Sequence, residues 1–295
     1  WLLRSGRNSG SADIAGCYAD IQRWEDIYNG GGDWRYARRG GIQGGTRKLA
    51  SLGAARALCG ELARLCFTEG TSMCYSDSDT ESFVNRVLTE SRFSERFPVF
   101  LEKVFALGGG VIKVYYDDSA PDGVPGVRVD LVTADCFLPT AWNSREITGG
   151  AFASRIVSGG RNYILAESQE LSGDQLTIEN RLFREDGGKA DMSSVLPGLS
   201  GQSSVKGLTA PLFVYLSAGS RRAASSGECP LLGSSVFDGA EDTLKSIDIV
   251  FDSLSREFVL GKKRIIVPAY AVRGEWDAAG NKKHYFDVND EVFQA

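Results

Sequence analysis

The chain has 295 residues, of which 42% are hydrophobic and 24% are charged, a composition that is typical of folded proteins and excludes a wholly disordered chain. This length exceeds what one compact core usually serves, so two or more structural units are expected. The 33 basic and 38 acidic residues give a net charge of −5, whereas a protein that grips nucleic acid through its phosphates is usually basic.

The first part of the chain combines aromatic residues with glycine clusters and leads into a basic stretch. Residues 34–60 contain six arginine and lysine residues and no acidic residue. Two interpretations stay open for this stretch. It is either a solvated arm that begins a helix, or a loop that touches phosphate or an acidic neighbouring subunit.

Two helical regions follow. Leucines recur at spacings of three and four over residues 47–67, which predicts a helix there, and Cys59 and Cys66 are expected to be buried on its apolar stripe. A second region, 81–107, has the same period, with Pro98 expected in the first turn of a helix that starts after a break near 91–96. Three consecutive glycines after residue 107 end this region.

The period of the apolar residues then changes from about 3.6 to 2. Short segments with this alternation, separated by glycine-rich turns, are typical of strands. These segments are residues 111–116, 126–132, 151–157, 163–171, 176–184 and 212–216. The order predicts an antiparallel meander, with residues 187–209 expected to be a loop.

The last informative element is a predicted helix over about residues 233–260, about 42 Å long at 1.5 Å per residue. Its apolar residues follow one another at steps of three or four and form a single stripe, which needs a partner. The stripe consists of Val236, Ala240, Leu244, Ile247, Phe251, Leu254 and Phe258.

The other side of this predicted helix carries six acidic and two basic residues. An excess of negative charge on one face indicates that this face lies in water or next to a molecule that the protein must repel and not bind. Lys262, Lys263 and Arg264 follow the helix, where cations complement the negative end of the helix dipole.

The sequence offers little for catalysis. A single histidine, His284, excludes most Ser-His-Asp and Cys-His chemistry and all multi-histidine metal sites. The glycine-rich residues 40–46 lack the lysine of a phosphate loop, and the acidic residues 77–81 begin a calcium-like loop without its later glycine and glutamate. Ser203 to Lys206 has S-x-x-K spacing but no companion motif. We therefore expect no enzyme, no metal and no cofactor.

Two other features bear on chemistry and compartment. The six cysteines contain no C-x-x-C pair, which favours folding in a reducing cytoplasm over a disulfide scaffold. A hydrolase built on carboxylates alone, such as Asp117, Asp118 and Asp122, is a third alternative, although a turn at the end of a strand explains these acids.

Several short motifs occur in a fixed order along the chain. They are Trp24 with Tyr28-Asn29-Gly30-Gly31-Gly32, followed by residues 61–69, 108–115, 134–139, 180–183, 230–235, 247–248 and 257–265. Each motif is weak alone, but their order and spacing over nearly the whole chain resemble the portal proteins of tailed bacteriophages, in the branch common among long-tailed phages.

This resemblance implies a ring, usually of twelve subunits, at one vertex of the capsid, through which DNA passes during packaging and ejection. Residues 1–230 would form the wing, residues 231–261 the first stem helix, and residues 262–295 the start of the clip. Family members continue through a second stem helix, a channel loop and usually a crown, so the chain is expected to be truncated at its C-terminus.

The resemblance also implies partners and a location in the virion, at the portal vertex, after assembly in the host cytoplasm. The expected partners are further copies of the chain, the terminase motor, the head-tail connector, the major capsid protein, and double-stranded DNA bound without sequence specificity; no membrane is involved. The stem residues expected to face the channel and repel DNA are Asp238, Asp242, Lys245, Asp248 and Asp252. Lys262, Lys263 and Arg264 are expected to make contacts in the clip.

The predicted fold class is therefore α+β. A helical N-terminal part and antiparallel strands are followed by a long stem helix and a small α/β clip. The alternative function is a capsid or tail adaptor, or another α+β protein-binding module, without a DNA channel.

Overall fold

The computed structural model describes residues 11–39, 45–67, 73–75, 77–117, 126–219, 231–261, 274–276 and 282–284. It mixes helices with antiparallel sheets, which confirms the predicted α+β class. The helices are α1 (Ser11–Tyr28), α2 (Ala54–Cys66), α3 (Ser78–Glu90), α4 (Phe93–Leu107), α5 (Met192–Val195) and α6 (Glu241–Leu260), with short 3-10 turns at η1 (Asp33–Arg35) and η2 (Ala134–Cys136).

Within the described residues, the strands form four antiparallel sheets. Their bounds are β1 (Tyr36–Arg39), β2 (Gly45–Lys48), β3 (Gly109–Asp117), β4 (Gly126–Thr133), β5 (Phe137–Trp142), β6 (Ile147–Ser158), β7 (Arg161–Ser172), β8 (Gln175–Arg184), β9 (Gln202–Lys206), β10 (Phe213–Ser217), β11 (Gly274–Trp276) and β12 (Lys282–His284). The strands β5 to β9 pair in chain order, which confirms the predicted meander for β6, β7 and β8, whereas the predicted strands 111–116 and 126–132 lie in another sheet. A second sheet has the order β10-β3-β4, and β1-β2 and β11-β12 are hairpins.

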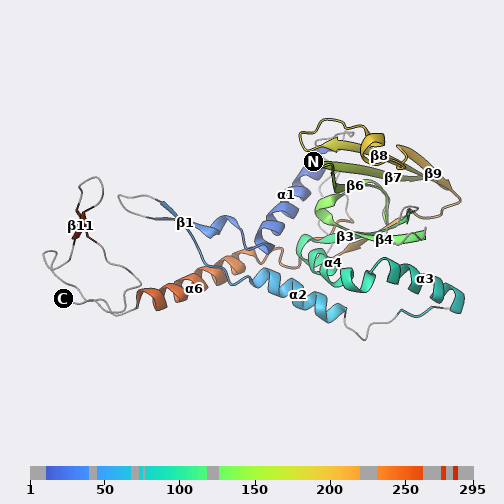
Figure 1. The fold of residues 1–295 in the computed structure, drawn as a ribbon. Helices are drawn as coiled ribbons and strands as arrows, with labels where there is room; N and C mark the ends of the chain where they lie inside the picture. The colour runs from blue at the N-terminus through green and yellow to red at the C-terminus, as the bar shows by residue number, and fades with distance from the viewer. Residues whose placement is uncertain are drawn as a thin grey trace.

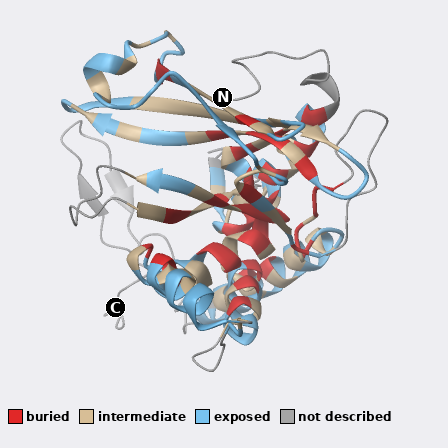
Figure 2. Ribbon diagram, turned by 90° about the vertical axis from the view of Figure 1, so that its right-hand side faces the viewer, coloured by how far each residue is buried: buried red, intermediate tan, exposed pale blue. Residues whose placement is uncertain are grey.

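The two larger sheets face each other across an aromatic core (Figure 2). Phe137 and Phe152 of the five-stranded sheet pack against Phe213 of β10, with ring centroids 5.4 to 5.8 Å apart. Helices α3 and α4 cover the opposite face of the three-stranded sheet, where Val104 and Phe100 are buried. The body therefore has three layers: helices, a small sheet and a larger sheet.

A second core joins the helices to one another. Trp24 of α1, Cys59 of α2 and Leu107 of α4 are buried in it together with Phe237, which lies just before α6. From this core, α6 extends away from the body toward the C-terminal end of the chain (Figure 1). The long helix therefore begins inside the body and leaves it.

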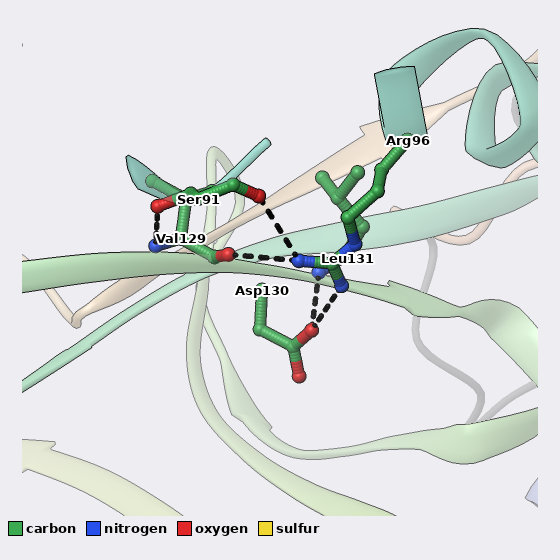
Figure 3. Close-up of polar contacts among 5 residues, drawn as sticks. All are labelled: Ser91, Arg96, Val129, Asp130 and Leu131. Atoms are coloured by element: carbon green, nitrogen blue, oxygen red, sulfur yellow. Dashed lines mark hydrogen bonds and ion pairs between the residues drawn. The ribbon is translucent and has the colours of Figure 1, made fainter. Parts of the chain in front are cut away.

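The break between α3 and α4 is fixed by hydrogen bonds to the neighbouring strand (Figure 3). Arg92 has a left-handed φ of 51°, and the Ser91 hydroxyl beside it accepts the backbone N–H of Val129 at 2.8 Å. The guanidinium of Arg96 donates to the Val129 carbonyl at 3.3 Å and to Asp130 at 2.7 Å. The predicted break is thus confirmed at Ser91–Arg92, but Pro98 lies in the second turn of α4 rather than the first.

Other boundaries differ from the prediction for local reasons. The helix expected over 47–67 begins at Ala54, because residues 45–48 pair with β1 and Gly53 adopts a φ of 70° that ends the extended segment. Helix α1 was not predicted, although its buried residues Ile14, Cys17, Ile21, Trp24 and Tyr28 follow one another at steps of three and four. The expected loop 187–209 contains α5 and β9, and β5 was also missed.

One close backbone contact predicts that a substitution at Gly108 will measurably lower the free energy of unfolding. Gly108 has a φ of 85°, and a Cβ atom there would lie 2.6 Å from the Gly233 carbonyl oxygen. Gly159 has a φ of 57° but no atom within 4 Å of its virtual Cβ. Gly159→Ala should lower the free energy of unfolding by about 1 kcal/mol through backbone strain alone. Gly108→Ala should lower it by about 1 to 3 kcal/mol more, because its new methyl group would also clash with the backbone. Urea unfolding measures both variants, and equal losses of stability would contradict the close contact.

Candidate functional site

The long helix is shorter than predicted. It begins at Glu241, because Gly239 adopts a φ of 78° and the preceding residues belong to the body. Leu231 and Leu232 are buried in the core between the sheets, and the backbone N–H of Val236 donates to the Phe105 carbonyl at 3.0 Å. The helix has 20 residues, so Val236 and Ala240 of the predicted stripe precede it.

Asp252 of α6 is bound by the segment that leads into α2. Its side chain is 4% exposed, and its two oxygens accept hydrogen bonds from Arg47 at 2.7 and 2.6 Å. One of these oxygens also accepts the backbone N–H of Ala50 at 2.9 Å. Such a two-pronged pairing fixes both the distance and the orientation of the carboxylate.

Asp248, one helical turn earlier, is held by the same part of the chain. It is 5% exposed and accepts hydrogen bonds from the indole N–H of Trp34 at 3.0 Å, the Ser51 hydroxyl at 2.9 Å and the backbone N–H of Leu52 at 3.0 Å. We call the two carboxylates and their donors the clasp. It consists of Trp34, Arg47, Ala50, Ser51, Leu52, Asp248 and Asp252.

The clasp stabilises the charged form of Asp252. The hydrogen bond from Arg47 is the largest cause that lowers the pKa of Asp252, to about 2, and the N–H of Ala50 adds to it against the opposing effect of burial. The same contact raises the pKa of the Arg47 guanidinium. Both groups therefore stay charged at neutral pH.

This arrangement corrects the expected channel-facing set. Asp248 and Asp252 are buried against their own chain, because donors of the basic stretch satisfy them, so they do not present charge outward. Asp238, Asp242 and Lys245 are exposed, as a solvent-facing side requires. Lys262, Lys263 and Arg264 lie outside the described residues, as does most of the predicted clip.

The basic stretch thus meets an acidic partner, as one of its two interpretations required, but that partner belongs to the same chain. Trp34 was missed as a site residue. The only sequence signal for it was its place at the start of a stretch with basic residues and no acids.

The apolar stripe of α6 becomes exposed toward the end of the helix. Leu244 packs against the helical core, and Ile247 and Phe251 are half-buried, but Leu254 and Phe258 are 56% and 74% exposed. Amphipathic helices usually turn their apolar side to the protein body. Around Leu254 and Phe258, α6 does the reverse: its polar side binds the body, and these two apolar side chains are left exposed by the described residues.

Another ion pair lies between the two larger sheets. Lys113 donates to Glu167 at 2.9 Å between the two sheets, with its ammonium 5.1 Å from the centroid of Phe152. Among the described residues, no group of three or more His, Cys, Asp or Glu side chains is placed to hold a metal ion.

Burial raises the pKa of Cys59 to about 12, whereas Cys66, expected to be buried, is exposed because α2 turns its alanines inward.

No protein-family model and no curated protein matches the chain. No helix in the described parts of the chain combines the length and the apolar composition needed to cross a membrane.

The clasp predicts a large and specific stability loss. Asp252→Ala leaves the Arg47 guanidinium and the Ala50 N–H without their acceptor, so it should lower the free energy of unfolding by about 2 to 3 kcal/mol. Asp242→Ala, on the exposed side of the same helix, should change it by no more than about 0.5 kcal/mol. Urea unfolding followed by circular dichroism measures both, and similar losses for the two variants would contradict the clasp.

The lowered pKa of Asp252 predicts how the clasp responds to acid. The folded-state pKa is about 2, below the value of about 3.9 expected in the unfolded chain. The stabilisation is therefore complete above about pH 5 and is lost as the pH falls through 2. The stability gap between wild type and Asp252→Asn should be constant from pH 7 to 5 and shrink from pH 4 to 2. A gap that does not change with pH would argue against the ion pair.

Proposed function

We propose that this chain is a portal protein of the tailed-bacteriophage type, which forms a ring at one capsid vertex and conducts DNA during packaging and ejection. In this proposal the layered body, residues 1–230, is the wing, residues 231–261 contain the first stem helix, and residues 262–295 begin the clip. The terminase motor, the head-tail connector and the major capsid protein would bind such a ring.

One observation carries the proposal. Helix α6 leaves an α+β body and keeps Leu254 and Phe258 of its apolar stripe exposed among the described residues, while its polar side is bound by the clasp. Exposed apolar stripes of this kind mark interaction surfaces. The ordered motifs of the sequence, including Ile247-Asp248 within α6, resemble those of portal proteins. This resemblance is the reason for proposing that the exposed surface forms a ring and not another assembly.

The electrostatic part of the proposal rests on fewer residues than the sequence suggested. Asp238, Asp242 and Lys245 are the exposed members of the expected channel-facing set. A conduit must not hold its cargo, because each neutralised phosphate adds salt-sensitive affinity. With Asp248 and Asp252 satisfied inside each subunit, repulsion of DNA would come from Asp238, which precedes α6, and from Asp242 within it.

A capsid or tail adaptor that contacts only protein is the second candidate. The burial of Asp248 and Asp252 favours it, because a protein-binding helix needs no acidic lining. An adaptor and a portal differ in assembly. Negative-stain electron microscopy of the purified chain should show rings with a pore wide enough for duplex DNA if it is a portal, and monomers or dimers would contradict that.

Two aspartate substitutions, one on each side of α6, test whether the apolar stripe forms the interface between subunits. Phe258→Asp should weaken assembly by about 2 kcal/mol per interface, or about thirtyfold, and shift rings to monomers without lowering the melting temperature of the monomer. Ser253→Asp, an exposed position on the other side of α6, should leave assembly unchanged. Light scattering after size-exclusion chromatography measures both. Intact rings in Phe258→Asp would place the interface elsewhere.

A further inference from the structure

Two helices of the described chain leave adjacent large apolar side chains exposed. On α6 they are Ile249, Val250, Leu254, Phe258 and Val259, of which Leu254 and Phe258 belong to the stripe, and on α2 they are Leu58 and Leu65, with Leu62 half-buried between them. The residues of α2 that face the body are small: Ala55, Cys59 and Ala63. Helix α2 therefore also turns its bulkier apolar side away from the core, like α6.

Ring symmetry restricts what can cover the α6 stripe. If two stripes met each other, the contact would be self-complementary and would close as a two-fold dimer. A ring of more than two copies needs two different surfaces on each subunit, one for each neighbour. The stripe must therefore meet a different apolar surface of the next copy.

The opposite side of α6 does not supply that surface. At 100° per residue, the positions opposite the stripe are held by Asp242, Lys245, Ile249 and Arg256, all of them exposed, and three of these four side chains are charged. An apolar stripe gains little from a charged helix face, because desolvating those charges costs free energy. Among described residues, α2 is the one other helix with more than one large apolar side chain exposed.

The spacing of the two surfaces also matches. The stripe residues Ile247, Phe251, Leu254 and Phe258 follow at steps of four, three and four, and Leu58, Leu62 and Leu65 follow at steps of four and three. Helices with this alternation of steps pack side by side with their side chains interleaved, at a small crossing angle.

We propose that the α6 stripe of one subunit packs on the leucine side of α2 in the next subunit. Each subunit then contacts one neighbour through its α6 and the other neighbour through its α2. This inference rests on the proposed ring. It assigns the two halves of the ring interface to α6 and α2, and it makes the interface head-to-tail.

Thiol cross-linking tests this pairing in the full chain. In a background with Cys66, Cys74, Cys136 and Cys229 replaced by serine, Leu58→Cys and Leu254→Cys are combined in one chain and treated with a short bis-maleimide. Each subunit then links to both neighbours, so denaturing gels should show a ladder of dimers, trimers and larger species. The matched control combines Leu58→Cys with Ser253→Cys, which lies beside Leu254 in sequence but on the other side of α6, and it should stay monomeric.

The outcomes separate this inference from the proposed function. Rings in electron micrographs without a ladder, or with the same ladder in the control, would overturn the α6–α2 pairing and leave the ring standing. Dimers from Leu254→Cys alone would show that the stripe meets itself, which also overturns the pairing. A link within one chain would migrate as a monomer and count against it. The absence of rings altogether would remove both the pairing and the proposed function.

Discussion

The hydrogen bonds of two buried carboxylates on α6 fix the orientation of this helix on the rest of the protein. Charged groups are tolerated inside a protein only where donors satisfy them, and Asp248 and Asp252 receive six hydrogen bonds. All six come from residues 34–52. Because the two carboxylates lie four residues apart on one side of the helix, these bonds fix the rotation of α6 about its own axis.

The exposure of the apolar stripe follows from that fixed rotation. Turning α6 to bury Leu254 and Phe258 against the body would gain about 1.5 to 3 kcal/mol for each side chain. The same turn would leave two buried carboxylates and the Arg47 guanidinium unpaired, at a cost of several kcal/mol for each charge. The polar contacts therefore outweigh the apolar ones within a single copy, and the stripe stays available to another molecule.

Sequence patterns predicted the elements better than their orientation. The α+β class, the break at Ser91–Arg92 and the meander of β6 to β8 follow from local spacing and turn residues. The period of α6 identified its apolar side, but the period cannot tell which side faces the body, because that depends on donors more than 190 residues away. For the same reason Asp248 and Asp252 were expected to face the channel. The period of α2 likewise placed both Cys59 and Cys66 on a buried side, although only Cys59 is buried.

The clasp also divides the two sides of α6 between two kinds of contact. Hydrogen bonds depend strongly on direction, so Trp34, Arg47 and the amides of residues 50 and 52 specify one orientation of the helix within the subunit. Apolar packing is less directional and is suited to a surface that meets the same neighbour many times around a ring. A helix that used its apolar stripe to bind its own body would leave a side on which charged residues such as Asp242, Lys245 and Arg256 stand among scattered apolar ones. By binding the body through Asp248 and Asp252, α6 leaves Leu254 and Phe258 of the stripe exposed.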